Sequence, residues 1–363
     1  MAAADVTYSV DGVPFSSFGV YVSASDGVVC KPAIKDPLSD DRSWMHGTVY
    51  DLSTLYYKEV SIQLRCFIEA NGYNDFLTKA LAFLAAFGDA PNTHNLGVTA
   101  GSGSFGAVVM CKDSVDIDKA WNADKFVGTF TLKLTVPDPD IPIRTNKTGG
   151  TIANNDVGYY VDGYKFVSYG VYVSASSGIT TLPGIKDPLT YNWGTHNGID
   201  YFSDGVRYKE RTITLKCFIE ASGYADLLNK AVSFFGRFAM NGTRRLKITA
   251  GGKILVYQVI CKDAISLTPD FRDPNKCVGT FTLKLIEPEP VKRVLSGGGS
   301  ITIKSPTPVN IYWGDGTHNY DVGGGGEAVT VSHSCSGETI ITGEPNDFTS
   351  FSSSSSILWS RLV

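Results

Sequence analysis

Hydrophobic and polar positions alternate without a break in a segment that begins at Val60, and the same pattern recurs 151 positions later. Successive side chains of a strand point to opposite faces, so a period of two predicts a half-buried strand. The apolar side carries a cysteine in both copies, which we expect to face the core: Val60, Ile62, Leu64, Cys66 and Ile68, then Ile213, Leu215, Cys217 and Ile219. The segments 127–136 and 278–285 alternate in the same way and predict a closing strand for each copy.

Between these strands the spacing of apolar residues changes from two to that of a helix. The first stripe follows Asn74 and Asp75 and contains Phe76, Leu77, Ala80, Leu81 and Leu84. The second follows Asp226 and contains Leu227, Leu228, Ala231, Val232 and Phe235. We therefore predict one helix per copy, near 74–87 in the first, and interpret the aromatic residues of both stripes as core.

Much of the chain is duplicated at the 151-residue offset, which slips to 150 around Cys111 and Cys261. Proline, glycine and polar residues interrupt the pattern at three places. The predicted organisation is a first domain over 1–138, a linker over 139–156, a second domain over 157–290, a linker over 291–299 and a third unit over 300–363. Short strand-like pieces with glycine-rich turns make the third unit a small β-sandwich. The predicted fold class is mainly β with one helix per repeat (α+β).

Composition narrows the function. The 363 residues contain 32 basic and 36 acidic side chains, a net charge of -4, which argues against a protein that clamps nucleic acid or an anionic membrane. We expect no membrane insertion, because no apolar run approaches transmembrane length and the N-terminus lacks a signal-peptide pattern. The chain is therefore expected to be made in the cytoplasm, with its seven cysteines as reduced, mostly buried thiols.

Residues with catalytic or metal-binding chemistry are scattered. The five histidines show no ligand spacing, and His46 and His196 are interpreted as solvated loop residues in corresponding loops. Asp315, within Trp313-Gly-Asp-Gly, suits a tight turn better than a calcium site. We expect no enzyme activity, no catalytic residue, no metal and no cofactor.

Two long loops do not fit a plain core interpretation. Each lies between an Ile-Lys-Asp-Pro-Leu segment and Tyr-Lys-Glu, and the two differ in sequence while keeping their length. Both are rich in large apolar side chains, which are costly in water and favour contact with a partner, although packing on their own domain explains them equally well. The candidate inter-subunit contacts are Trp44, Met45, Tyr50, Tyr56, Tyr191, Trp193, Tyr201 and Phe202.

The order of elements resembles the distal tail protein family of tailed bacteriophages. The resemblance rests on Asp11-Gly-Val-Pro-Phe, the loop ending at Tyr57-Lys-Glu, the strand, the helix and the closing strand, and on their second copies from Asp162-Gly-Tyr-Lys-Phe onward; it covers roughly 1–138 and 157–290. It implies a tail-tube fold of two β-sheets and a flanking helix, whose sheets join between subunits into a six-domain ring around a DNA channel, with no catalytic residues. The Trp313 segment resembles immunoglobulin-like or polycystin-repeat-like modules.

The resemblance predicts a structural virion protein of the phage tail, at the distal end or baseplate, whose partners are itself, the adjacent tail tube and the baseplate hub. The duplication also resembles tail tube proteins with two tube domains per chain, and a component of a tail-like injection machine or its trimeric hub remains open. A cell-surface carbohydrate-binding β-sandwich protein is the alternative from a different class. Because the two loops differ, we expect six chains per assembly rather than three. DNA is expected to pass a non-basic channel without specific binding, and the third unit to be a tethered, dispensable module.

Overall fold

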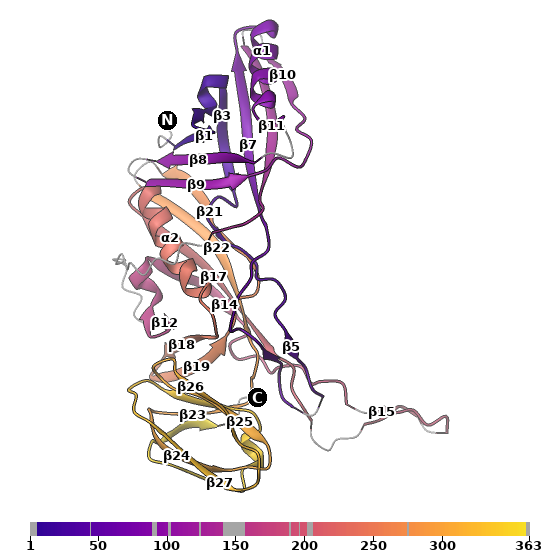
Figure 1. Ribbon diagram of the computed structural model, residues 1–363, viewed down its shortest axis with the longest axis vertical. Coiled ribbons are helices and arrows are strands. Elements are labelled where there is room, and N and C mark those ends of the chain that lie inside the picture. Colours follow the sequence, from indigo (N-terminus) through magenta and orange to yellow (C-terminus); the bar gives the residue numbers. More distant parts are fainter. Residues whose placement is uncertain are drawn as a thin grey trace.

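The computed structural model describes residues 6–43, 45–88, 93–100, 103–122, 125–140, 157–188, 190–195, 197–201, 206–273 and 276–360. Two similar β-sandwiches and a third, smaller one follow one another along the long axis of the molecule (Figure 1). The mainly β fold with one α-helix in each of the two copies confirms the predicted class. Within the described residues, neither helix is long and apolar enough to cross a membrane.

The first copy contains two four-stranded sheets, ordered β2-β1-β8-β9 and β10-β11-β7-β3. The helix α1 packs against β7 and β11, and Phe83 on its inner side meets the ring of Phe15 edge-on at 5.1 Å. The elements are β1 (Val6–Val10), β2 (Val13–Pro14), η1 (Phe15–Phe18), β3 (Val20–Asp26), β7 (Val60–Ala70), α1 (Tyr73–Ala85), β8 (His94–Ala100), β9 (Gly103–Val109), β10 (Asp118–Asn122) and β11 (Lys125–Val136).

The second copy repeats this arrangement, with sheets β13-β12-β18-β19 and β14-β17-β22-β21. Even the register is the same: Phe130 lies opposite Cys66 on β7, and Phe281 lies opposite Cys217 on β17. The elements are β12 (Val157–Val161), β13 (Tyr164–Lys165), η2 (Phe166–Tyr169), β14 (Val171–Ser177), β17 (Arg211–Ala221), α2 (Tyr224–Phe238), β18 (Arg244–Ala250), β19 (Lys253–Val259), β21 (Thr268–Asp273) and β22 (Lys276–Glu287).

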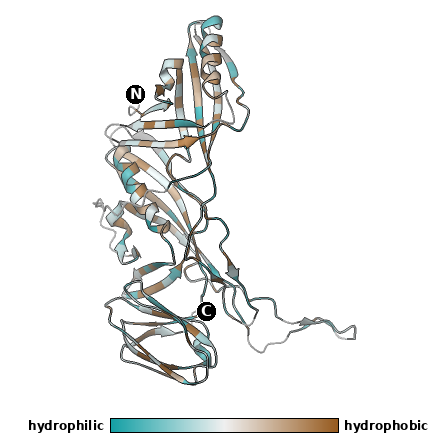
Figure 2. Cartoon of the chain, in the orientation of Figure 1, coloured by the Kyte–Doolittle hydropathy of each residue, from teal (hydrophilic) through white to brown (hydrophobic). Residues whose placement is uncertain are grey.

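The side chains of these strands are buried in the alternating pattern that the sequence predicts. Ile62, Leu64, Leu132, Leu215 and Leu283 are completely buried, while the residues between them are exposed or half-buried. Both predicted cysteines face the core, and burial raises the pKa of the Cys66 and Cys217 thiols to about 12. Figure 2 shows the brown hydrophobic bands of the strands interrupted by teal polar positions.

The third unit is a sandwich of a five-stranded sheet, β26-β25-β28-β23-β30, and a three-stranded sheet, β27-β24-β29. Its core contains Ile301, Ile303, Val309, Ile311 and Trp313. The elements are β23 (Lys292–Leu295), β24 (Gly299–Lys304), β25 (Pro308–Tyr312), β26 (His318–Gly323), β27 (Ala328–His333), β28 (Thr339–Thr342), η3 (Pro345–Asp347), β29 (Ser350–Ser353) and β30 (Ile357–Ser360).

The predicted linker over 291–299 is wrong, because β23 lies inside it and is an interior strand of the larger sheet, between β28 and β30. The glycines Gly297 and Gly298 lie in the turn between β23 and β24 and do not form a tether. Of the other predicted linker, residues 141–156 lie outside the described part of the chain.

The third unit is docked on the second copy by buried contacts. Val256 of β19 packs with Val294, Tyr312 and Ile340 of the third unit, and all four are buried. The Arg245 guanidinium donates to the backbone oxygens of Glu338 and Tyr312 at 2.5 and 2.9 Å. The third unit is therefore packed on the second copy, and the prediction of a freely tethered module is wrong.

A candidate assembly surface

The two long loops, residues 27–59 and 178–210, take different paths from equivalent starting points. The first loop runs along the second copy toward the third unit, whereas the second projects from the body of the molecule as an arm (Figure 1). Their short strands are β4 (Cys30–Lys31), β5 (Ser39–Asp40) and β6 (Val49–Tyr50) in the first, and β15 (Thr190–Tyr191) and β16 (Asp200–Tyr201) in the second.

The last residue of β3 and the start of the first loop, residues 26–34, dock on the second copy, and we call them the first docking segment. Its strand β4 pairs with β20 (Ile265–Ser266) of the second copy. The Leu267 amide donates to the Val29 oxygen at 3.0 Å, and the Ile34 amide donates to the Lys262 oxygen at 2.9 Å. Backbone pairing of this kind extends the second copy with a strand from the first.

A buried lysine holds the centre of this contact. Lys31 has no exposed surface, and its amino group donates to the oxygens of Pro32, Cys261 and Asp263 at 2.9, 2.9 and 3.3 Å. Burial lowers the pKa of Lys31, which is the cost of bringing an ammonium group into the protein. Three carbonyl acceptors satisfy its three N–H donors, so the charge is tolerated there.

The part of the second copy that receives this segment is its acceptor face, which consists of the outer side of α2 and residues 261–267. The helix α2 packs against β4 and β9 of the first copy. At its start, Tyr224 is 6 % exposed, and burial together with the nearby Tyr8 of β1 raises the pKa of its phenol. Ile265 and Leu267 are also buried. The two copies therefore share one continuous hydrophobic core.

The equivalent acceptor face on the first copy, α1 and residues 111–117, is more exposed than that of the second copy. Tyr73, which corresponds to Tyr224, is 43 % exposed, and Leu81 of the same helix is 64 % exposed. Val115 and Ile117, which correspond to Ile265 and Leu267, are only half-buried.

The equivalent docking segment of the second copy, residues 177–185, is also more exposed than its counterpart. Leu182, which corresponds to the buried Lys31, is 53 % exposed. Ile185 is 49 % exposed, whereas its counterpart Ile34 is 4 % exposed. Among the described residues, the interface between the two copies is therefore buried once within the chain, while the equivalent residues of the first acceptor face and of the second docking segment are exposed or half-buried.

The predicted contact residues divide between these two situations. Met45 and Tyr50 are half-buried, and Tyr50 packs against the second copy of its own chain, where its hydroxyl donates to Glu210 at 2.6 Å. The others that the structure describes are exposed: Tyr56, Tyr191, Trp193 and Tyr201, with the rings of Tyr191 and Trp193 4.0 Å apart. Trp44 and Phe202 lie outside the described residues.

The sequence did not predict the residues that hold the first loop against the second copy and the third unit. The prediction of a solvated His46 is wrong: it is 7 % exposed, stacks on Tyr208 and lies 3.0 Å from the Glu344 carboxylate, while the Tyr208 amide donates to its Nδ1 atom. Glu344 also pairs with Arg207 at 3.2 Å. His196 lies outside the described residues. The only sequence signal for these contacts was that His46 lacks an aligned counterpart.

At Gly47 the backbone of the first loop lies very close to the backbone of the second copy. Its φ is 68°, and a β-carbon there would lie 1.8 Å from the Pro288 oxygen. The neighbouring Thr48 amide donates to that same oxygen at 3.0 Å. Only glycine fits this conformation and this distance, so the first loop is shaped to the end of the second copy.

The predicted turn residue Asp315 lies in a hydrogen-bonded cluster of the third unit. Asp315 accepts from the Thr317 amide at 3.0 Å, and its other carboxylate oxygen lies 2.6 Å from the His333 ring. These contacts lower the pKa of Asp315 and close the turn after Trp313. Among the described residues, no group of three acidic, histidine or cysteine side chains is placed to hold a metal ion.

No family model matches the chain, and no curated protein matches its sequence.

Proposed function

We propose that the chain is a structural component of a bacteriophage tail that assembles head to tail through the interface its own two copies form. The observation that supports the assembly is that, among the described residues, this interface is buried once within the chain, while its two other halves are exposed or half-buried. A contact between two different surfaces generates a closed ring or an open filament. The resemblance to distal tail proteins favours a ring of six domains around a DNA channel, at the distal end of the tail or in the tube itself.

The relative orientation of the two copies affects how many chains would form the ring. In Figure 1 the helix α2 of the second copy is inclined relative to the helix α1 of the first, so the two copies are not oriented alike. If the same contact is repeated from the second copy to the first copy of another chain and closes on itself, all domains lie in one ring. Six domains would then require three chains.

This arrangement removes the reason for expecting six chains. The first long loop contacts the next domain along, which is the second copy of the same chain, and the third unit that is docked on that copy. In a ring of three chains the second long loop would contact the first copy of a neighbouring chain. The two loops then face different surfaces within one ring, so their divergence fits three chains, which we now prefer.

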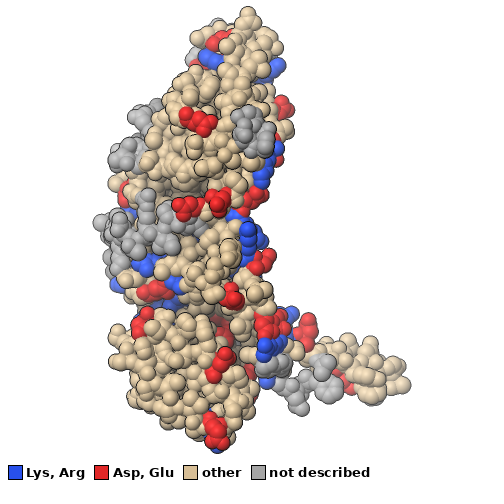
Figure 3. Space-filling model, in the orientation of Figure 1, with Lys and Arg blue, Asp and Glu red and all other residues tan. Residues whose placement is uncertain are grey.

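The surface charge supports passage of DNA without capture. In Figure 3 basic and acidic side chains are interspersed with wide uncharged areas on the face that is seen. The phosphate backbone is held mainly by clustered lysine and arginine. We propose that the channel lacks such clustering and that DNA passes without specific binding.

The mass of the assembly tests the proposal. Native mass spectrometry and negative-stain images of the purified chain should show a ring with three times 39.1 kDa, whereas six times that mass would restore the hexamer. The substitutions Leu81→Glu on α1 and Leu182→Glu on the second docking segment should each leave a folded monomer. Val329→Glu, on the third unit and 37 % exposed, is the matched control and should leave the ring intact. Rings that persist in both interface variants would contradict the proposed interface.

A further inference from the structure

A cavity of about 580 Å³ lies where three parts of the chain meet. The first long loop contributes residues 48–53, the end of the second copy contributes Pro288 and Glu289, and the third unit contributes strands β25 and β26. A volume of this size is typical of sites for small organic molecules. The cavity is separate from both docking segments and both acceptor faces.

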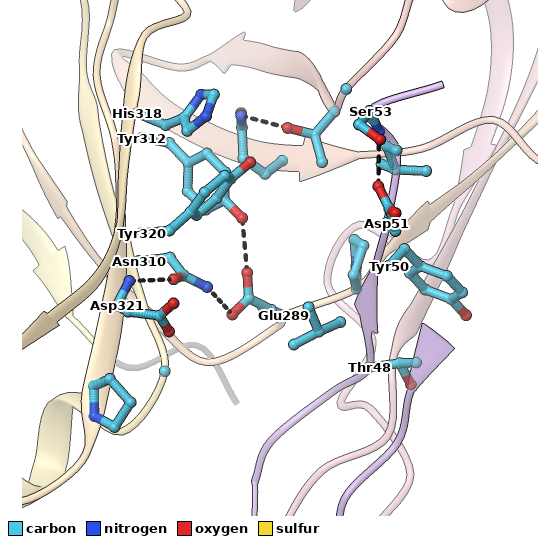
Figure 4. A pocket seen from close by; sticks show the side chains of 18 of the residues that line it. Thr48, Tyr50, Asp51, Ser53, Glu289, Asn310, Tyr312, His318, Tyr320 and Asp321 are labelled. Atoms are coloured by element: carbon cyan, nitrogen blue, oxygen red, sulfur yellow. Dashed lines mark hydrogen bonds between the residues drawn. The ribbon is translucent and has the colours of Figure 1, made fainter. Parts of the chain in front are cut away.

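One wall of the cavity is aromatic. Tyr320 is 54 % exposed, its ring centroid lies 4.2 Å from that of His318, and it meets Tyr312 at an interplanar angle of 78°. Tyr50 forms part of the opposite side (Figure 4). Exposed aromatic faces bind flat apolar surfaces, which include the C–H faces of sugar rings.

The base of the cavity is fixed by a hydrogen-bonded carboxylate. Glu289 accepts from the Tyr312 hydroxyl at 2.9 Å and from the Asn310 amide at 3.0 Å (Figure 4). The other end of the Asn310 side chain accepts from the Asp321 amide at 3.2 Å. These groups hold one another, so the wall above them is rigid before any ligand arrives.

Asp321 beside this wall has an unusual backbone conformation. Its φ is 54°, in the left-handed region, next to an irregularity in the pairing of β25 with β26. Bulges and strained residues of this kind redirect side chains and occur preferentially at functional sites. The exposed Asp321 side chain lies beside Tyr320 at the cavity, where its carboxylate can accept hydrogen bonds from a ligand.

The charges of the lining select the class of ligand. Asp51, Glu289 and Asp321 line the cavity, and none of its described lining residues is a lysine or an arginine, which disfavours phosphates and other anions. An organic cation is also disfavoured, because the Lys262 ammonium already lies 4.8 Å from the centre of the Tyr50 ring. Hydroxyl groups, in contrast, donate to carboxylates and exchange hydrogen bonds with the amide of Asn241, which also lines the cavity.

We propose that this junction cavity binds a neutral carbohydrate. One sugar ring packs against Tyr320 and His318, and its hydroxyl groups donate to Asp321. Because the cavity spans the first long loop, the second copy and the third unit, it exists only while the third unit is docked. The site goes beyond the proposed assembly and does not depend on it.

Binding should be measured on the full chain with neutral probes: the methyl glycosides of glucose, galactose, mannose and N-acetylglucosamine, and the disaccharides maltose, lactose and cellobiose. Saturation-transfer NMR and calorimetry should detect at least one of them, with a Kd near 1 mM, which corresponds to about -4 kcal/mol. Choline chloride, N-acetylneuraminic acid and inorganic phosphate serve as the cationic and anionic probes and should not bind.

Two substitutions and one control locate the binding. Tyr320→Ala should weaken it at least tenfold, and so should Asp321→Asn, which keeps a residue that tolerates the left-handed region. The control is Tyr21→Ala, an exposed tyrosine of the first copy that also stacks on a neighbouring ring, and it should bind as the parent chain does. Circular dichroism and the assembly mass of each variant separate this test from that of the ring.

The proposal is overturned if none of the neutral sugars binds at concentrations up to about tenfold above the expected Kd, or if choline or an anion binds in their place. It is also overturned if the Tyr320→Ala variant binds the sugar with the affinity of the parent chain. Failure of the chain to form rings would leave the cavity, and therefore this proposal, untouched.

Discussion

The second acceptor face is covered and the first is open, although the two copies share the same strands and the same register. On α2 the outer stripe of Tyr224, Leu228 and Phe235 is buried, whereas the equivalent residues of α1 are exposed or half-buried. The fold of the copy is therefore independent of whether this face is filled. The two faces differ in what packs on them, since the first docking segment lies on the second acceptor face. The proposed assembly would place an equivalent segment from another chain on the first acceptor face.

The same comparison explains the third unit. It lies on β18 and β19, where Arg245, Lys247 and Val256 reach into it. The equivalent positions of the first copy are Asn95, Gly97 and Gly106, which offer little side chain to hold a partner. The second copy has acquired a docking face that the first lacks.

Removing the third unit is expected to have the largest effect. A chain that ends at Pro290 loses Lys292, whose ammonium pairs with Glu287 where neither is exposed, and leaves Glu287 beside Arg211 alone. Breaking a buried ion pair costs about 3–5 kcal/mol, and Val256 would also become exposed. We expect aggregation, or a thermal midpoint at least ~10 °C lower by calorimetry. A soluble truncated chain with an unchanged thermal midpoint would contradict this prediction. It would show that the second copy, like the first, is stable without a third unit.

Matched substitutions at one position of the two docking segments test the comparison directly. Ile34→Asp places a carboxylate in the filled interface, where Ile34 is 4 % exposed, and should destabilise the chain by about 3–5 kcal/mol. Ile185→Asp, at 49 % exposure, should change the stability of the dissociated chain by less than about 0.5 kcal/mol. Urea unfolding measures both.

In the assembled state the second substitution should act differently. Ile185→Asp is expected to prevent ring formation while the chain stays folded, because the counterpart of Ile185 is buried in the interface. Equal losses of stability from the two substitutions in the dissociated chain would show that the second segment is also buried, and that the comparison is wrong.

Local periodicity predicted the parts of the fold that depend on neighbouring residues in the sequence. The alternation from Val60 and the stripe from Phe76 fixed the strands, the helices and the buried cysteines, because side-chain direction follows directly from the period. The third unit was predicted as a sandwich for the same reason. Its start was misplaced because β23 is only four residues long and is followed by glycines that are typical of a linker.

The contacts between units could not be predicted in the same way. Nothing in the sequence around His46 indicates that Glu344, almost 300 positions later, will lie beside it. The burial of Lys31 depends on three backbone oxygens, two of them from the second copy, and backbone oxygens leave no trace in the sequence. Only the alignment of the two copies contains a signal, since Lys31 stands where the second copy has Leu182.

Two equivalent cysteines provide the mildest test, because they can be followed without any substitution. Cys261 lies under the first docking segment, and burial raises the pKa of its thiol to about 11. Cys111 occupies the same place on the open acceptor face and is half-buried. The reactive species is the thiolate, and the reagent must also reach it, so iodoacetamide should modify Cys111 at least about tenfold faster than Cys261 in the dissociated chain.

Assembly through the proposed interface should erase this difference, because a docking segment from a neighbouring chain would then cover Cys111. Peptide mass spectrometry after timed alkylation, with the dissociated and assembled chain in parallel, measures both rates. Cys335, half-buried in the third unit, is the internal control whose rate should stay the same. If Cys111 reacts equally fast before and after assembly, the chains associate through another surface, and the open acceptor face is not the one that neighbouring chains use.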